Sequence, residues 1–377
     1  MLISKRFFTG LMLSSLFSFN ISAGEIDNML SEMTLEQKVG QMLLVGFRGF
    51  TAEEGSQIVR DLSEYHIGSV ILFDRDVALG SNERNIKTTE QVKNLNEQLQ
   101  SYSDIPLLIS IDQEGGFVTR LKPQHGFRAN TPSHQRLGEE GLETTLNASE
   151  VLGRNLSELG INLNFAPVVD LNVNPRNPII GRFQRSFSDD PNSVTAHAAE
   201  FIRGHELNRV GAVLKHFPGH GSSENDSHVG FTDVTHTWSD VELKPFKELI
   251  EKGKADFIMT AHVFNRHLDS EVPATLSKRV IDGILRNELG FDGVIISDDM
   301  NMGAIKDHFD HSESVVMAIN AGVDILLFGN NLEFDENIIP TVHSIIMTAI
   351  EDGKISIERI EESARRVLKF KQKIDLI

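Results

Sequence analysis

Charged residues and histidines stand at the ends of four apolar runs in this sequence. They are Asp112 and Glu114 in "LLISIDQEGG", Lys215 and His216 in "LKHFPGHG", His262 in "MTAHV", and Asp298 and Asp299 in "ISDDM". An apolar run has little reason to end in a buried acid unless that acid has a partner or a task. If the four runs end at the same side of the fold, these side chains form one polar site.

A metal site is one use for such a set of residues. His216 and His220 are four residues apart, as in a helical zinc motif, and the Asp298–Asp299 pair could complete the site. Pro218 and Gly219 lie between the two histidines, so the helical geometry is lost. We therefore expect no metal ion and no other cofactor.

Glycoside hydrolysis is the second use. A retaining glycosidase needs one carboxylate as nucleophile and a second group that first donates and then accepts a proton. The loop "GSSENDSH" carries Asp226 and His228 two residues apart, and an aspartate can orient a histidine and tune it near neutral pH. The composition of the loop is equally typical of a solvated turn, so both interpretations stay open at this point.

Eight apolar runs must position these residues. They begin at Gln41, Ser69, Pro106, Asn164, Gly211, Phe257, Gly293 and Asp324. Each is almost continuously apolar, as expected of parallel strands that are covered on both faces. Helix-like stretches separate them, which predicts a single (β/α)8 TIM-type barrel, with polar groups gathered at the carboxyl ends of the strands. An open doubly wound sheet is the alternative, but no Gly-x-Gly-x-x-Gly follows the first run.

The helix-like stretches carry their own signals. Thr34 stands three residues before Gln37 in a capping-box pattern, and residues 192–208 place Val194, Ala198, Phe201 and Ile202 on one helical face. Residues 274–293 have helical spacing, with Gly290 as a stop signal. The last predicted helix, from Ile355 to Ile374, is amphipathic.

Composition limits the partners and the compartment. The 377 residues carry a formal charge of -18 and no cysteine. The negative charge argues against nucleic acid and anionic membranes as partners, and the missing cysteine excludes disulfides, a catalytic thiol and a lipoprotein anchor. Residues 1–23 have the three parts of a secretory signal peptide, which predicts cleavage near Ala23, an exported protein and no stable membrane anchor. A buried N-terminal helix is the alternative. Oligomeric state is not predicted.

Six motifs together resemble a known family. They are "DQEGGFVTR", "NFAPVVDLN", "GRFQRSFSDDP", "KHFPGHGSSENDSH", "MTAHV" and "GVIISDDMNM", in this order. The sequence resembles the β-N-acetylglucosaminidases of glycoside hydrolase family 3. The resemblance implies one catalytic barrel over residues 24–377, of the TIM type found in single-domain bacterial members.

The resemblance also implies roles for individual residues. Asp298 corresponds to the nucleophile that forms a covalent glycosyl-enzyme, His228 to the acid/base, and Asp226 to its partner. The residues that correspond to sugar-binding positions are Asp112, Arg120, Arg185, Lys215 and His216. We further expect Lys215 and Arg185 to help keep Asp298 ionised.

The implied substrate is a carbohydrate with a terminal β-linked N-acetylglucosamine, from peptidoglycan fragments or chito-oligosaccharides. Some relatives use phosphate in place of water, so phosphorolysis is an alternative on the same site. A metal-dependent barrel hydrolase and a non-catalytic sugar-binding protein are alternatives of other classes. The sequence departs from the family pattern at Phe117, where cytoplasmic members often have arginine, and in the predicted signal peptide.

Overall fold

Eight parallel strands form the centre of the fold, as the sequence predicted. The computed structural model describes residues 23–128 and 130–377, and within them the hydrogen-bonded strands run in the order β10-β1-β2-β3-β4-β5-β7-β9. A bridge between Ile296 and Ile325 joins the two outer strands, so the sheet closes into a barrel. The strands are β1 Leu43–Gly46, β2 Ser69–Leu72, β3 Leu108–Ile111, β4 Leu163–Asn164, β5 Gly211–Phe217, β7 Phe257–Thr260, β9 Val294–Ile296 and β10 Leu326–Phe328.

The fourth strand differs most from the prediction. It covers only two residues, and the apolar run that follows joins β5 through a single bridge between Val168 and Lys215. Pro167 interrupts this run and has no backbone N–H to donate to a neighbouring strand. A small two-stranded sheet, β6 Thr232–Asp233 with β8 Val263–Phe264, lies outside the barrel and was not predicted.

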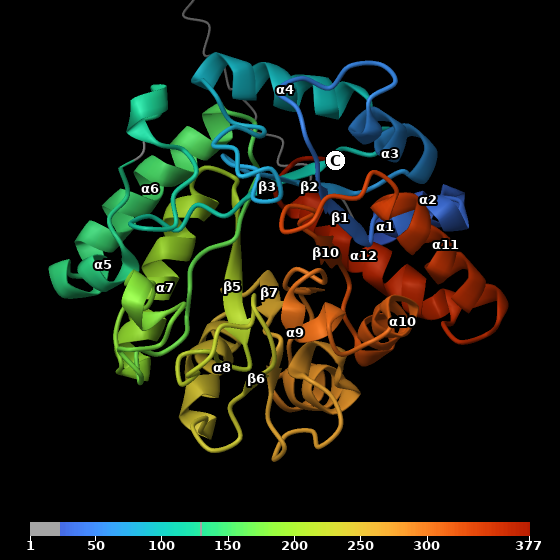
Figure 1. The fold of residues 1–377 in the computed structure, drawn as a ribbon. Helices are drawn as coiled ribbons and strands as arrows, with labels where there is room; N and C mark the ends of the chain where they lie inside the picture. The colour runs from blue at the N-terminus through green and yellow to red at the C-terminus, as the bar shows by residue number, and fades with distance from the viewer. Residues whose placement is uncertain (1–22, 129) are drawn as a thin grey trace, which may run out of the picture.

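Helices surround the barrel (Figure 1). The longer ones are α1 Ala23–Glu32, α2 Leu35–Gly40, α3 Gln57–Tyr65, α4 Thr89–Ser101, α5 His134–Glu140, α6 Leu142–Glu158, α7 Pro191–Glu206, α8 Lys244–Glu251, η5 Arg279–Glu288, α10 His311–Ala321, α11 Ile338–Glu351 and α12 Ile357–Lys373. The shorter ones are η1 Pro123–His125, η2 Gly181–Phe183, η3 Asp240–Leu243, η4 Ala274–Leu276 and α9 Gly303–Lys306. Within residues 23–128 and 130–377, none of the helices combines the length and the apolar character that a membrane span requires.

The predicted helix signals correspond to observed helix ends. Thr34 and Gln37 form the capping box of α2 with both hydrogen bonds present. The helix predicted over residues 274–293 is divided: residues 274–276 form η4, and η5 begins at Arg279, just after Ser277, whose hydroxyl accepts the backbone N–H of Val280. It ends before Gly290, whose φ of 70° suits a residue without a side chain. The predicted signal peptide, residues 1–23, lies outside the described residues except for Ala23, where α1 begins.

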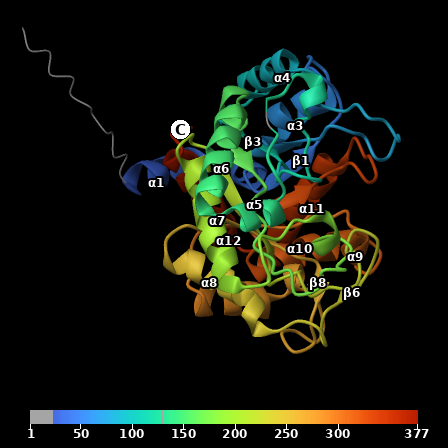
Figure 2. The same ribbon diagram turned by 90° about the vertical axis from the view of Figure 1, so that its left-hand side faces the viewer.

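The last helix seals one end of the barrel. The inward-facing residues of the strands form one buried cluster together with Val367 and Phe370 of α12. The ring of Phe370 packs edge-on against Phe257, with 4.5 Å between ring centroids, and a Cβ at Gly211 would lie 2.5 Å from the Phe370 ring. Figure 2 shows α1 and the C-terminus at one end of the molecule and β6, β8 and α9 at the other. The open end of the barrel is therefore the end at which the strands finish.

Replacing Phe370 by Ala should lower the free energy of unfolding by about 3–5 kcal/mol, because it removes a buried ring and leaves a cavity at the sealed end. Lys369→Ala, at an exposed position of the same helix, is the matched control and should change stability by less than about 0.5 kcal/mol. Urea unfolding followed by circular dichroism measures both. Equal small losses in the two variants would show that Phe370 does not hold the barrel closed.

Candidate active site

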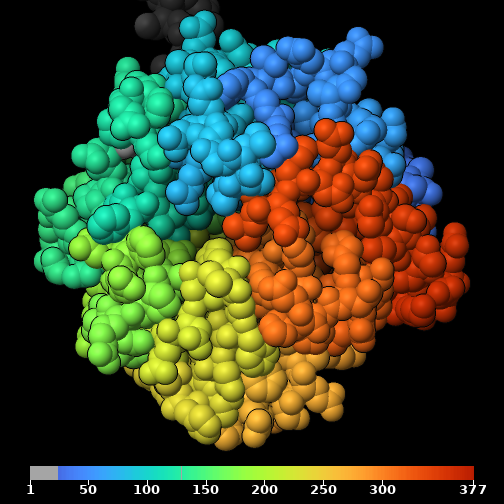
Figure 3. Space-filling view, in the orientation of Figure 1, coloured from blue at the N-terminus to red at the C-terminus, as the bar shows by residue number. Residues whose placement is uncertain are grey.

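A cavity of about 390 Å³ opens at the carboxyl ends of the barrel strands. Figure 3 shows this face of the molecule, where segments from the N-terminal, middle and C-terminal thirds meet around a hollow. All eight residues predicted for the site line the cavity: Asp112, Arg120, Arg185, Lys215, His216, Asp226, His228 and Asp298. The barrel thus brings together side chains that are up to 186 positions apart in the sequence, from Asp112 to Asp298.

Asp298 and Asp299 follow β9 but have different surroundings. The backbone N–H of Asp299 donates to Asp298 Oδ1 at 2.9 Å. Asp299 Oδ1 accepts the backbone N–H groups of Asn301 and Gly329, both at 3.0 Å. A Cβ at Gly329 would lie 2.4 Å from the second Asp299 oxygen, so only glycine fits there. Burial raises the pKa of Asp299 to about 6, and its hydrogen bonds assign it to holding the β9 and β10 turns together.

The charge on Asp298 is stabilised by three histidines. Burial alone would raise its pKa, but His216, His262 and His228 outweigh this effect and lower the pKa of Asp298 to about 2. His262 is held in place by Thr275 on one side, 2.8 Å from Nδ1, and by the Asp299 carbonyl oxygen on the other, 3.0 Å from Nε2. Asp298 is therefore a carboxylate at neutral pH.

Lys215 and Arg185 are engaged elsewhere, contrary to the expectation that they keep Asp298 ionised. Lys215 Nζ lies 2.7 Å from Asp112 Oδ1 and 2.6 Å from Glu114 Oε1. Arg185 binds Glu114 with two hydrogen bonds, of 2.8 and 2.7 Å. Burial would raise the pKa of Glu114, but Arg185 and Lys215 lower it well below its usual range. Glu114 stood in the sequence motif without an assigned role, and the structure makes it the common partner of both cations.

Asp112 remains accessible to a ligand at the edge of this cluster. Its carboxylate is 21% exposed and accepts Lys215 through one oxygen, while Arg120 lies 3.3 Å from the other. Arg120 is in turn 3.8 Å from Asp74, a buried acid that also pairs with Lys122 at 2.6 Å. Acceptors and donors thus alternate along one wall of the cavity, as recognition of sugar hydroxyl groups requires.

His216 is oriented by Asp170, which sequence reasoning missed. Asp170 Oδ2 lies 2.7 Å from His216 Nδ1, and Oδ1 accepts the backbone N–H groups of His216 and His220 at 3.2 and 2.8 Å. Because Asp170 accepts a hydrogen bond from Nδ1 of His216, the other ring nitrogen, Nε2, faces the cavity and lies 3.4 Å from Arg185. Asp170 ends the fourth apolar run, so the rule that identified the other rim residues also applies to it.

Asp226 and His228 form a hydrogen-bonded pair on the loop after β5. His228 Nδ1 lies 2.8 Å from Asp226 Oδ1, and the same oxygen accepts the His228 backbone N–H at 2.9 Å. Burial would lower the pKa of His228, but the hydrogen bond to Asp226 and the charge of Asp298 raise it. The pair can therefore hold a proton near neutral pH at the mouth of the cavity.

His220, which the sequence left without a role, anchors this loop. It is buried, its Nδ1 lies 2.6 Å from Ser223 Oγ, and its Nε2 lies 3.0 Å from Ser227 Oγ. Burial lowers its pKa to about 4, so the ring is neutral and presents one donor and one acceptor to the two hydroxyl groups. Ser227 immediately precedes His228, so His220 fixes the end of the loop that carries the Asp226–His228 pair.

The described residues contain no group of three or more potential metal-binding side chains. The rings of His216 and His220 are 5.9 Å apart, and each is hydrogen-bonded to its own protein partners. The structure therefore uses the "HFPGH" segment to arrange a loop.

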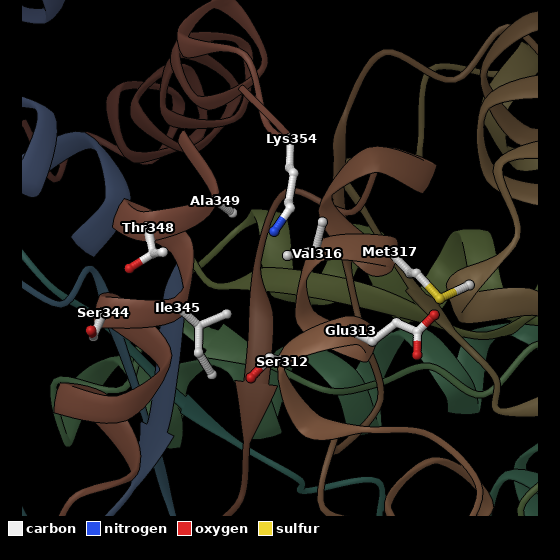
Figure 4. A pocket seen from close by; sticks show the side chains of 9 residues that line it. All are labelled: Ser312, Glu313, Val316, Met317, Ser344, Ile345, Thr348, Ala349 and Lys354. Carbon is white, nitrogen blue, oxygen red and sulfur yellow. The ribbon is translucent and has the colours of Figure 1, made fainter. Parts of the chain in front are cut away.

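A second depression, of about 580 Å³, lies between α10 and α11 on the outside of the barrel (Figure 4). Its walls are mainly small and aliphatic side chains, with Glu313 and Lys354 at the rim. Glu313 is the one carboxylate among the described residues that line it, so it lacks the paired groups found in the barrel cavity.

Comparison with known proteins agrees with this geometry. Residues 34–370 match the family model of the glycosyl hydrolase family 3 N-terminal domain. The chain is 32% identical to beta-hexosaminidase A of Pseudoalteromonas piscicida over 91% of its own length, but spans only 62% of that protein. It is also 32% identical to beta-hexosaminidase LpqI of Mycobacterium tuberculosis, over 89% of this chain and 82% of LpqI. A family 3 beta-N-acetylglucosaminidase from Paenibacillus sp. has a similar structure, with a TM-score of 0.83 and 38% identity over 91% of this chain and 63% of that one.

The chain therefore belongs to glycosyl hydrolase family 3, and the resemblance noted in its motifs is confirmed.

Glu242 of η3 packs against the start of the loop after β5. It is buried, its Oε2 accepts the backbone N–H of Gly221 at 3.0 Å, and a Cβ at Gly219 would lie 2.6 Å from its own Cβ. Its Oε1 has no hydrogen-bond partner among the described residues. Burial, with a smaller effect from the charge of Asp170, raises the pKa of Glu242 to about 7.

Glu242→Gln should change the pH dependence of stability. A carboxyl with a pKa near 4.5 unfolded and about 7 folded stabilises the fold fully below pH 4.5, and this contribution disappears as the pH rises through 7. The variant should therefore gain stability relative to wild type between pH 4.5 and 8, by roughly 3 kcal/mol. Urea unfolding across this range measures it, with Glu251→Gln at an exposed position as control. A difference that does not vary with pH would contradict the raised pKa.

Proposed function

We propose that this protein is a retaining exo-β-N-acetylglucosaminidase that removes a terminal β-linked N-acetylglucosamine unit through a covalent glycosyl-aspartate. One observation carries the proposal: an ionised Asp298 and the Asp226–His228 pair line a single sugar-sized cavity. The names of the family 3 relatives, beta-hexosaminidases and a beta-N-acetylglucosaminidase, support the substrate class.

The reaction would proceed in two steps. In the first, Asp298 attacks the anomeric carbon while His228 donates its proton to the glycosidic oxygen, so the bond breaks and the leaving alcohol departs neutral. In the second, His228 accepts a proton from water as the water oxygen attacks the same carbon and releases Asp298. Asp226 stabilises the imidazolium form before the first step and after the second.

The wall formed by Asp112, Arg120 and Lys215 would bind the hydroxyl groups of the terminal sugar. A carboxylate can accept two hydroxyl groups, while lysine and arginine donate without competing as bases. Arg185 and His216, one layer deeper, would orient this wall and meet the N-acetyl group. We also propose export of the protein, because residues 1–23 have the pattern of a signal peptide. We propose peptidoglycan fragments and chito-oligosaccharides as the two substrate classes that an exported enzyme of this kind would meet.

Asp298→Ala should reduce hydrolysis of an aryl β-N-acetylglucosaminide by on the order of 10⁴-fold or more, because the nucleophile is lost. Azide should restore turnover and yield an α-glycosyl azide, since a small anion can occupy the vacated space. Asp292→Ala, at the opposite end of the same strand, is the control and should keep wild-type rates. Near-wild-type activity of Asp298→Ala would contradict the proposal, and a phosphate-dependent sugar phosphate product in wild type would indicate phosphorolysis.

Asp226→Asn should shift the alkaline limb of the kcat/KM profile to lower pH. Asp226 raises the pKa of His228, and the protonated form is the acid, so removing the charge lowers the pH at which the acid is lost. The measurement is kcat/KM against pH with a glycoside that has a poor leaving group. An unchanged alkaline limb, with the same fold by circular dichroism, would show that another group donates the proton.

A further inference from the structure

Two phenylalanines stand exposed at the mouth of the catalytic cavity. The side chains of Phe117 and Phe183 are 65% and 45% exposed, yet both line the cavity that contains Asp298 and His228. Their ring centroids are 6.1 Å apart, and the ring planes meet at 76°. Large apolar side chains exposed together beside a polar cavity are typical of a surface that binds a ligand.

The backbone holds Phe117 in a fixed position. It lies in a tight turn in which Gly115 and Val118 exchange two backbone hydrogen bonds, each of 3.1 Å. Gly115 and Gly116 have φ values of 103° and 56°, and a Cβ on Gly116 would lie 2.6 Å from Ser133. The turn is therefore packed closely against the chain at Ser133.

The backbone near Phe183 is fixed against the same segment. Phe183 ends η2, and the next residue, Gln184, accepts a hydrogen bond from the Ser133 hydroxyl at 3.0 Å and one from the Gln135 backbone N–H at 3.2 Å. The Arg185–Glu114 ion pair also joins the two loops that carry the rings. Both rings thus stand on a rigid support, which lowers the entropy lost when a ligand binds.

The place of the rings decides what they contact. The deep part of the cavity offers charged and hydrogen-bonding groups such as Lys215 and Asp112, which suit the hydroxyl groups of the sugar that is cleaved off. The mouth offers the faces and edges of two phenyl rings. When the scissile glycosidic bond of a substrate lies between Asp298 and His228, the part of the substrate that reaches the two rings is the leaving group.

We propose that Phe117 and Phe183 form a second sugar-binding position, which packs the C–H face of a pyranose ring on the leaving side of the scissile bond. The inference rests on the proposed function and extends it: the natural substrate is a di- or oligosaccharide, and the leaving group is itself a β-linked amino-sugar unit. A pyranose in the chair form presents a flat set of C–H groups, which pack on an aromatic face and leave its hydroxyl groups in water. Chito-oligosaccharides and peptidoglycan fragments share this chemistry and differ in the charged lactyl group of the latter.

The test compares substrates with and without a leaving sugar. Phe117→Leu and Phe183→Leu keep an apolar side chain but lose the flat ring. Each should lower kcat/KM for N,N′-diacetylchitobiose by on the order of tenfold, and change that for methyl β-N-acetylglucosaminide by less than about twofold. Phe117→Tyr should retain wild-type rates, since the ring remains. Leu207→Ala, an exposed apolar residue outside the cavity, is the control.

A second disaccharide, N-acetylglucosamine linked to N-acetylmuramic acid, represents the peptidoglycan fragments and is tested with the same variants. Equal losses on both disaccharides support a site for any pyranose, and a loss on one of them identifies that source. Parallel losses on the disaccharides and the methyl glycoside, or no loss on any substrate, would overturn the second sugar position while leaving the hydrolase assignment intact. If the wild-type protein cleaves neither of the two disaccharides nor the methyl glycoside, the proposed function is rejected instead.

Discussion

A buried carboxylate between two cations holds this site together. Glu114 is almost inaccessible to solvent and binds Arg185 through two hydrogen bonds and Lys215 through a third contact. These partners come from the loop after β3, the loop after β4 and strand β5, so one acid joins three consecutive segments of the barrel. Removing any member would leave an uncompensated charge in the interior, which is far more costly than losing a surface ion pair. The sugar-binding wall and the exposed aromatic pair both stand on the segments that Glu114 connects.

The loop that carries His228, the proposed proton donor, is held by a chain of hydrogen bonds that begins at the buried carboxylate of Asp170. Asp170 binds the backbone at His216 and His220, His220 binds the hydroxyl groups of Ser223 and Ser227, and Ser227 leads into His228. Asp298, the proposed nucleophile, instead closely follows the barrel strand β9. This division is consistent with the chemistry proposed: the attacking carboxylate must stay in place, whereas the acid must meet leaving groups of varied shape. The bonds from His220 to Ser223 and Ser227 are neutral hydrogen bonds, which are individually weaker than the charge-assisted bonds that Asp170 accepts.

The barrel and the meeting of Asp112, Lys215, His216 and Asp298 were predicted from the positions of residues along strands. The other four site residues lie on loops and were assigned through the family resemblance. Parallel strands place their carboxyl ends at one rim, so the ends of apolar runs are enough to locate the cavity. Partnerships across that rim do not follow from position. Lys215 and Arg185 were expected to support Asp298, but they bind Glu114, and three histidines act on Asp298 instead. A cation pairs with the acid that lies within a few ångströms of it. A pattern of residue types does not contain these distances, so the sequence could not identify the partner. Asp170 is different, because it ends the fourth apolar run and obeys the same positional rule.

Asp298 and Asp299 show that environment, rather than residue type, separates the proposed nucleophile from a neighbouring acid that binds the backbone. They are adjacent, both follow β9, and burial acts to raise the pKa of each. The pKa of Asp298 nevertheless falls to about 2, because its carboxylate lies in the field of His216, His262 and His228, whereas that of Asp299 rises to about 6. Asp299 also carries hydrogen bonds from two backbone N–H groups, which tie it to the turns. The difference belongs to the two positions and not to the two side chains, because both residues are aspartates. Gly329 leaves room for the Asp299 carboxylate, because a Cβ at this position would lie 2.4 Å from its Oδ2.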